Sequence, residues 1–291
     1  MELAIVAKYC VGAHYDALVG NFGPAGMPSA LVLTIDNLGE ARALQRGTQA
    51  PDEPVGNDPS VTVALPWLLD ALDAHRLSAT FFVEAINCEL YPDAVRVIAA
   101  RGHELGLHGW RHEQWASLSG AEERDILTRA VEAFAALGVD ARGFRPPGGE
   151  LNSRSPALLR GAGLRWCSPA GGAAGVRGGL AYVPFAWSFV DAYHLMDTFA
   201  ALRTSRGDPE PSLEPGVLAD QFEDELQELV VTGSLRTMVL HPFLMLDEGW
   251  AGGVSRLFAF IAELARERRT WVVPGGVFAD WLISAGVALT S

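Results

Sequence analysis

Five ionisable side chains lie at or near the ends of short apolar segments, and together they could support metal-assisted chemistry on a carbonyl group. Asp36, His108, Arg145 and His241 end the segments LVLTID, ELGLH, GFR and TMVLH, and His112 follows His108 by four residues. Imidazole nitrogens bind Zn²⁺ and similar ions at neutral pH, and two histidines at this spacing can reach one ion. Three protein ligands with open positions are typical of a catalytic metal site. The His pair with Asp36 therefore predicts such a site.

The hydrophobic pattern predicts alternating strands and helices that would bring these residues together. Expected strands cover residues 31–36, 80–83, 104–108, 143–145, 164–167, 181–185, 237–241 and 270–273, and expected helices cover residues 66–75, 92–100, 121–137, 217–231 and 254–268. Such strands pair in parallel, because a helix is the usual crossover. About eight strands without a break in composition predict a single-domain α/β fold, a (β/α)7–8 barrel. Its strands would present all their carboxyl ends on one face, where the five side chains should meet.

The remaining organisation is simple. Residues 1–30 are interpreted as an N-terminal extension, and residues 31–285 as the barrel domain. Long loops are expected at residues 39–60, 171–179 and 203–216. Ser119 and Glu122 have the spacing of a capping box at the start of the helix expected at residues 121–137, and Gly138 ends that helix.

Composition excludes several classes of protein. With 22 basic and 35 acidic residues, the net charge of −13 argues against a nucleic-acid binder, which needs a basic face. Neither an export signal nor a membrane-spanning apolar run is visible. Cys10, Cys88 and Cys167 are too few and too scattered for a disulfide framework. We expect a cytoplasmic protein without nucleic-acid or membrane partners, and a homo-oligomer is one alternative for its assembly.

Several motifs, in order, resemble the polysaccharide deacetylase superfamily (NodB-homology, carbohydrate esterase family 4-like). The stretch SATFFVEAINCELYPDAVRVIAARGHELGLHGWRH resembles the core of that family. Thr34–Asn37 (TIDN) resembles the motif T-F-D-D, Arg145–Gly149 resembles R-x-P-x-G, and Val239–His241 resembles L-x-H. The resemblance covers residues 31–282. It implies a distorted (β/α) barrel and metal-dependent hydrolysis of an acyl–nitrogen, sometimes an acyl–oxygen, bond.

The resemblance also implies a divalent metal, with Zn²⁺ favoured and Mn²⁺, Co²⁺, Ni²⁺ or Fe²⁺ as alternatives. Its ligands would be His108, His112 and an acid or amide at Asp36 or Asn37. The family has a second aspartate where this chain has Asn37, which brings no charge to the ion. If Asp36 is a ligand instead, Glu40 could share the work of the base.

The other site residues are assigned by the same comparison. Asp36 would remove a proton from the attacking water, Arg145 would hold Asp36, and His241 would protonate the leaving nitrogen. Asp191 would either orient His241 or cap a loop. Backbone N–H groups of the segment Pro147, Gly148 and Gly149 could line the oxyanion. The candidate pocket walls, each also compatible with a place in the core, are Trp110, Trp187, Tyr193 and Trp250.

Departures from the family pattern favour a particular subgroup. Gly148 stands where an aromatic residue is usual, and the motif D-x-x-D-W is not visible. HGWRHE, LHPFL and the closing run SRLFAFIAELARERRTWVVPGGVFADWL are similar to allantoinase-like and cyclic-imide-hydrolase-like members. The prediction is therefore a hydrolase of an amide, N-acetyl or cyclic imide bond in a small intracellular molecule. The alternatives are a non-catalytic ligand-binding barrel with a degenerate metal site, and a carbohydrate N- or O-deacetylase.

Overall fold

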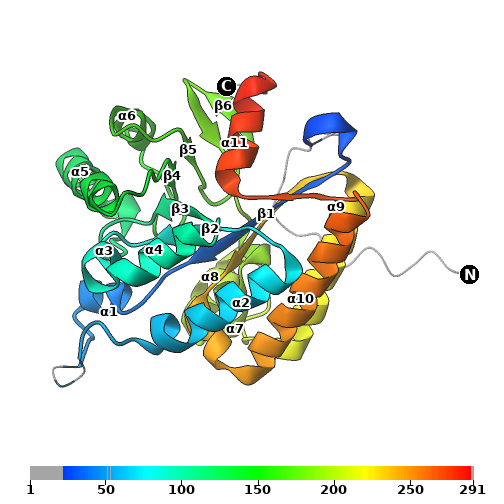
Figure 1. Cartoon of the computed structure of the whole chain (residues 1–291), viewed down its shortest axis with the longest axis horizontal. Helices are drawn as coiled ribbons and strands as arrows, with labels where there is room; N and C mark the ends of the chain where they lie inside the picture. The colour runs from blue at the N-terminus through cyan, green and yellow to red at the C-terminus, as the bar shows by residue number, and fades with distance from the viewer. Residues whose placement is uncertain (1–21, 51, 53, 290–291) are drawn as a thin grey trace, which may run out of the picture.

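Strand β1 (Ala30–Asp36) lies at the centre of the fold (Figure 1). It pairs in parallel with β2 (Thr80–Val83), β8 (Leu235–Leu240) and β9 (Trp271–Val273). All of its residues are buried, as expected for a parallel strand covered on both faces. The computed structural model describes residues 22–50, 52 and 54–289. Cys10 and most of the expected N-terminal extension lie outside the described residues.

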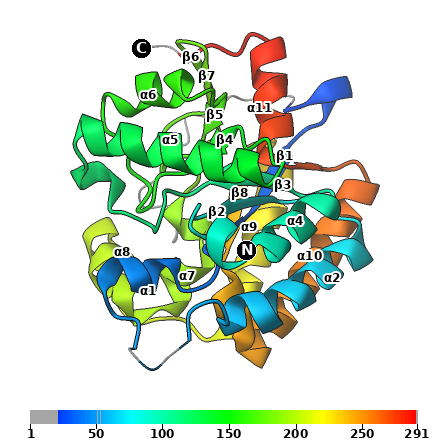
Figure 2. The same ribbon diagram turned by 60° about the vertical axis from the view of Figure 1, so that its left-hand side comes forward.

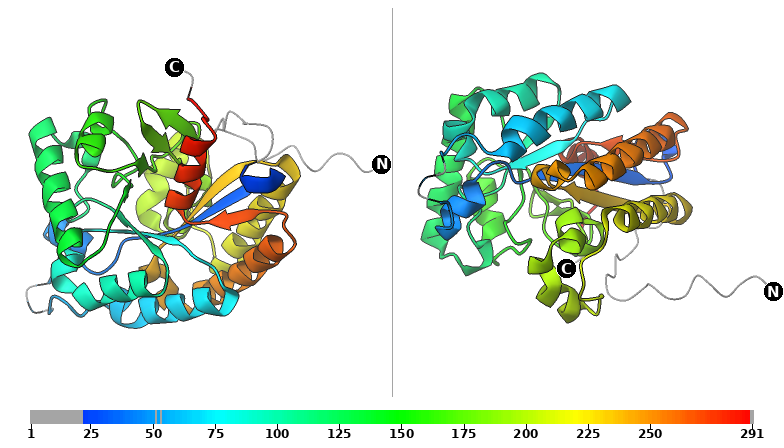
Figure 3. Two further views of the ribbon diagram at one scale, coloured as in Figure 1. Left: turned by 45° about the horizontal axis from the view of Figure 1, so that its top comes forward. Right: turned by 90° about the horizontal axis from the view of Figure 1, so that it is seen from below.

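The sheet forms a curled, incomplete barrel. Its other strands are β3 (Glu104–Leu107), β4 (Gly143–Phe144), β5 (Trp166–Cys167), β6 (Gly175–Arg177) and β7 (Leu180–Tyr182). The hydrogen-bonded path runs β6-β7-β5-β4-β3-β2-β1-β8, and all of its pairs are parallel except β6 with β7. The path ends at β6 on one side and at β8 on the other (Figure 3). The prediction of a single-domain α/β fold of the distorted-barrel type is confirmed.

Helices cover the outer side of this sheet. The helices of the described residues are α1 (Ala41–Arg46), α2 (Leu65–His75), α3 (Asn87–Leu90), α4 (Pro92–Ala100), α5 (Gly120–Ala136), α6 (Ser155–Gly161), α7 (Asp191–Leu195), α8 (Ala200–Arg206), α9 (Pro215–Thr232), α10 (Glu248–Arg266) and α11 (Gly275–Ser284), and the longer ones provide most of this cover. The α10 residues Val254, Leu257, Phe258 and Ile261 are buried at spacings of three and four, so one face of the helix packs inward. Helix α10 contacts both α2 and α9 (Figure 3). In the described part of the chain, no helix is both long and apolar enough to cross a membrane.

The capping box predicted for the long third helix is present at the start of α5. Ser119 Oγ accepts a hydrogen bond from the backbone N–H of Glu122, and the Glu122 carboxylate accepts one from the N–H of Ser119. These contacts satisfy two N–H groups that the first turn of a helix leaves without partners. The signal for the beginning of this helix was therefore fully local.

Several elements lie where the sequence did not predict them, among them β6, α1 and α11. Strand β6 falls in the expected loop at residues 171–179 and joins β7 through the two-residue turn Gly178–Gly179. Both glycines have positive φ, 57° and 83°, which matches the twist of a two-residue hairpin. Helix α1 interrupts the expected loop at residues 39–60, and α11 begins directly after Pro274, among residues typical of turns.

Residues just before β1 pack against the barrel. The ring of Phe22 stacks at 6.4 Å from that of Phe278 and lies 6.4 Å from that of Trp281, both in α11. Phe22 is buried as a result. The described end of the expected extension is thus part of the folded unit.

Candidate active site

The side chains singled out in the sequence lie at the carboxyl ends of neighbouring parallel strands. Asp36 is the last residue of β1, whereas His108, Arg145 and His241 directly follow β3, β4 and β8. The strand order β4-β3-β2-β1-β8 places these ends next to one another (Figure 2). Strand β2 lies between β1 and β3, and the residue that follows it is Glu84.

Asp36 and Arg145 form a buried ion pair. Arg145 Nη1 donates to Asp36 Oδ1 at 2.6 Å and to Thr34 Oγ1 at 2.8 Å. The two charged side chains are only 1% and 7% exposed, so water screens their attraction little. The pair uses Oδ1 of Asp36, which leaves Oδ2 to accept a proton from another group.

The guanidinium of Arg145 is fixed on several sides. Its Nε and Nη2 donate to Ser168 Oγ at 3.3 and 2.9 Å. Its Cζ lies 4.3 Å from the ring centre of Phe82 and 4.9 Å from that of Phe185. These contacts hold both Arg145 and the carboxylate that it binds in one position.

Replacing Arg145 with methionine is expected to lower the free energy of unfolding by about 3–5 kcal/mol, because Asp36 would remain as an unpaired buried charge. Urea denaturation would measure the loss. Arg256→Met is the matched control, since Arg256 is 48% exposed and its pairs with Asp220 and Glu223 should each contribute less than about 1 kcal/mol. Equal losses in the two variants would contradict the buried-pair interpretation.

His108 is oriented by the backbone of β4. Its Nδ1 lies 2.8 Å from the carbonyl oxygen of Arg145 and donates to it, which leaves the lone pair of Nε2 free. Burial lowers the pKa of His108 to about 3, so the ring is neutral at physiological pH. A neutral imidazole with its second nitrogen held by a carbonyl is the usual arrangement of a metal ligand.

His112 and Glu84 complete a cluster of three potential ligands with His108. One ligand atom from each residue lies within 4.8 Å of the others. The two imidazole rings are 4.9 Å apart and nearly perpendicular, at 78°. Burial also lowers the pKa of His112 well below its ordinary value. Two neutral imidazoles and one carboxylate are a donor set suited to Zn²⁺, so the residues present fit the metal that the resemblance implies.

Glu84 was not among the predicted site residues. Its Oε1 accepts a hydrogen bond from Asn37 Nδ2 at 2.7 Å, and its Oε2 accepts one from the N–H of Leu38 at 3.2 Å. Glu84 is completely buried, and this burial raises its pKa to about 8. Of the two residues predicted to supply the third ligand, Asp36 is not a member of the three-residue cluster, and Asn37 contacts the cluster through its hydrogen bond to Glu84. The signal that could have identified Glu84 is its place at the end of the strand TFFV.

His241 is held by Asp191. Asp191 Oδ1 lies 2.5 Å from His241 Nδ1, and Asp191 Oδ2 accepts from the backbone N–H of His241 at 2.8 Å. Trp250 Nε1 donates to the same Oδ2 at 3.2 Å. This arrangement leaves His241 Nε2 for a substrate, which fits the orienting role predicted for Asp191. Trp250 is fully buried behind Asp191 and does not line a pocket.

The predicted oxyanion segment offers fewer donors than expected. Pro147 has no N–H, and the N–H of Gly149 donates to the Pro146 carbonyl oxygen at 2.8 Å within the turn. A Cβ at Gly149 would lie 2.6 Å from that of Ala170, which explains why glycine is needed there. Of the three predicted residues, Gly148 remains the candidate donor.

Two of the predicted pocket walls are packing residues. Tyr193 is completely buried, and its hydroxyl donates to Asp208. Trp110 is 4% exposed, and the guanidinium of Arg129 covers its ring at 3.4 Å. Trp187 is half-buried and lies among other aromatic rings. Trp187 alone of these three therefore retains some exposed surface for a ligand.

Both carboxylate oxygens of Glu40 accept hydrogen bonds that hold the surrounding structure in place. Its Oε1 accepts from the N–H of Gly56 at 2.5 Å, and its Oε2 accepts from the hydroxyl of Tyr91 at 2.5 Å. Tyr91 also accepts from the N–H of Asp58 at 2.8 Å. Both carboxylate oxygens of Glu40 thus fasten the loop before α2, which does not support the idea that it shares the work of the base.

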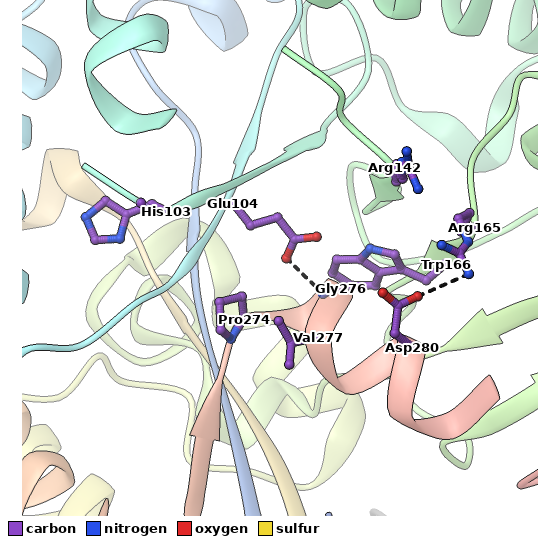
Figure 4. Close-up of a pocket in the computed structure, with 10 residues that line it drawn as sticks. His103, Glu104, Arg142, Arg165, Trp166, Pro274, Gly276, Val277 and Asp280 are labelled. Carbon is purple, nitrogen blue, oxygen red and sulfur yellow. Dashed lines mark hydrogen bonds and ion pairs between the residues drawn. The ribbon is translucent and has the colours of Figure 1, made fainter. Parts of the chain in front are cut away.

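A separate pocket of about 390 Å³ lies at the opposite end of the strands (Figure 4). It is lined in part by His103 and Glu104, at the start of β3, and by Trp166 at the start of β5. The Glu104 carboxylate accepts from the N–H of Gly276 at 2.8 Å (Figure 4). This contact satisfies one N–H in the first turn of α11, so Glu104 has a structural role there.

Comparison with known proteins finds similarity to one family. The family model described as polysaccharide deacetylase matches residues 56–167. A peptidoglycan deacetylase from Helicobacter pylori is 28% identical over 121 residues, which are 41% of each protein, so the chain covers less than half of that relative. The crystal structure of a protein from Mycobacterium smegmatis described as a "putative polysaccharide deacetylase" is similar with a TM-score of 0.79 and 26% identity, over 94% of this chain and 97% of that one.

These matches show that residues 56–167 are similar to the polysaccharide deacetylase family, and they support the resemblance found in the sequence. The finer prediction of an allantoinase-like subgroup has weaker support. A Puue allantoinase structure is similar in fold, with a TM-score of 0.71 over 90% of this chain and 92% of its own, at 15% identity. That similarity shows the fold alone.

Proposed function

We propose that this chain is a metal-dependent hydrolase of a carbon–nitrogen bond, and that its substrate carries an N-acetyl group on an amino sugar. The observation that carries the proposal is the convergence of three units at one edge of the sheet. They are the Asp36–Arg145 pair, the His241–Asp191 pair and the Glu84–His108–His112 cluster. The name of the H. pylori relative, a peptidoglycan deacetylase, favours an acetylated sugar over the small cyclic imide or amide expected from the sequence.

Asp36 and His241 carry out the two proton transfers of the proposed reaction. Asp36 Oδ2 removes the proton of the attacking water, while Arg145 keeps the carboxylate in place and stabilises its charge. The deprotonated water adds to the acyl carbon, and the N–H of Gly148 stabilises the negative charge that develops on the former carbonyl oxygen. His241 Nε2 then protonates the leaving nitrogen, and Asp191 stabilises the imidazolium form of that ring. When bound at His108, His112 and Glu84, a divalent cation supplies Lewis acidity to the carbonyl and the water.

Acetate release from a panel of substrates tests this function. The zinc-loaded full-length protein would be incubated with an N-acetylglucosamine oligomer, a cyclic imide and an acetyl ester. We expect release of acetate and a free amine from the oligomer, lost when the metal is removed by a chelator and regained when Zn²⁺ is returned.

Two other results would lead to different conclusions. Hydrolysis of the imide without release from the oligomer would restore the small-molecule prediction. Tight binding of metal and oligomer without turnover would favour the ligand-binding barrel, and the proposal would be wrong.

A further inference from the structure

The family pattern does not show which residue supplies the third, charged ligand of the metal cluster in this chain. The pattern would supply a charged ligand from position 37, but this chain has an amide there. A site with two neutral imidazoles and no carboxylate would hold a divalent cation weakly. The charge must therefore come from another residue.

We infer that Glu84, not Asp36 or Asn37, is the carboxylate ligand of the metal, and that Asn37 is the residue that orients it. This inference rests on the metal site of the proposed function. It moves the charged ligand from the end of β1 to the end of the adjacent strand β2. The resulting set, two histidines and one glutamate, is an established donor set of catalytic zinc sites.

The environment of Glu84 supports this role. The side chain is completely buried, and none of the ion pairs among residues 22–50, 52 and 54–289 includes it. Its hydrogen-bond donors, Asn37 Nδ2 and the backbone N–H groups of Leu38 and of Glu84 itself, are neutral. A carboxylate can accept about four hydrogen bonds, so at least one lone pair remains free. Arg42 is close enough to interact with Glu84 electrostatically but forms no ion pair with it, so burying this carboxylate is costly, and a divalent cation at the His pair would offset that cost.

Asp36 is unsuited to the same task. Its Oδ1 binds Arg145 at 2.6 Å, so its charge is already compensated. Asp36 also lies outside the group of ligand atoms within 4.8 Å of one another. This arrangement leaves Asp36 available as the base, and it separates two duties that the sequence had left open between Asp36 and Asn37.

Asn37 and Glu84 form a matched pair. Asn37 has a φ of 61°, in the left-handed region that asparagine tolerates better than most residues. Its amide lies 2.7 Å from Glu84 and donates to it. An aspartate at this position would set two carboxylates against each other, which is unfavourable without a metal between them. The amide at position 37 is therefore explained by the glutamate at position 84.

Zinc titration of the metal-free, full-length protein tests the inference without measuring activity. Glu84→Gln should reduce the affinity for Zn²⁺ by more than about 100-fold, because even the loss of an outer hydrogen-bond partner commonly costs about 10–100-fold. Glu104→Gln is the matched control. Glu104 is a partly buried glutamate at the far end of β3 (Figure 4), and its variant should bind Zn²⁺ normally.

A second variant tests whether a carboxylate at position 37 can replace the carboxylate of Glu84 as a ligand. In Asn37→Asp combined with Glu84→Gln, the carboxylate returns to β1, and we expect at least a tenfold gain in Zn²⁺ affinity over Glu84→Gln alone. Unchanged affinity in Glu84→Gln would overturn the inference while leaving the proposed function intact. Absence of Zn²⁺ binding by the unaltered protein would overturn both.

If Glu84→Gln does not fold, the metal ligands can still be identified in the unaltered protein. An anomalous difference map of zinc-loaded crystals should place the ion at a ligand distance of about 2.0–2.2 Å from a Glu84 oxygen. An ion bound by the oxygen of Asp36 or Asn37, with Glu84 out of reach, would show that the inference is wrong.

Discussion

Replacing either His108 or His112 with alanine is expected to abolish both the bound metal and the hydrolytic activity. Each variant removes one of the three clustered donors, and the remaining two cannot hold the ion at micromolar concentrations. Elemental analysis of the purified variants, beside acetate release, would measure both effects. The loss of affinity should exceed the 10–100-fold that is typical when an outer hydrogen-bond partner is removed.

His103→Ala provides the control for this prediction. His103 is also buried and also lies next to β3, but it precedes the strand and lines the pocket at the opposite end (Figure 4). This variant should retain its metal. Normal metal content in both His108→Ala and His112→Ala would show that the cluster does not bind the ion, whatever happens to activity.

The fold and much of the site could be predicted because their signals are local. Asp36, His108, Arg145 and His241 each end an apolar segment, and a parallel sheet places such ends on one face. The capping box at Ser119 is equally local. The rule that located these four residues applies to Glu84 as well, because Glu84 follows the strand TFFV. The family pattern indicated a ligand at position 37 instead. Only the pairing of β1 with β2 shows that Asn37 and Glu84 are in contact.

Other features depend on contacts between distant parts of the chain. Arg129 of α5 covers the ring of Trp110, which no pattern around either residue predicts. Asp208 binds the hydroxyl of Tyr193, and so removes a residue expected at the pocket wall. Gly149 has the sequence of an open turn, but its N–H is used within that turn. Residue type indicated which interactions these residues could make with a ligand. Contacts with distant residues determine which of those groups remain available for one.

His241→Ala is expected to slow hydrolysis of an N-acetyl substrate by about 10²–10⁴-fold, the usual contribution of general acid–base assistance. An amine is a poor leaving group and needs a proton before it departs. An aryl acetate has a good leaving group that needs little protonation, so the same variant should lose far less activity on that ester. The metal content should stay normal, because His241 lies outside the three-ligand cluster.

The companion variant Asp191→Asn separates protonation from positioning. Asp191 holds His241 by both the ring Nδ1 and the backbone N–H, and an asparagine could keep one of these contacts but not the charge that stabilises the imidazolium. It should therefore show the same preference for the ester, to a smaller extent. Metal loss in His241→Ala would make His241 a ligand. Equal rate losses on the amide and the ester would make it a positioning or oxyanion residue, and in either case the assignment of His241 as the general acid would be wrong.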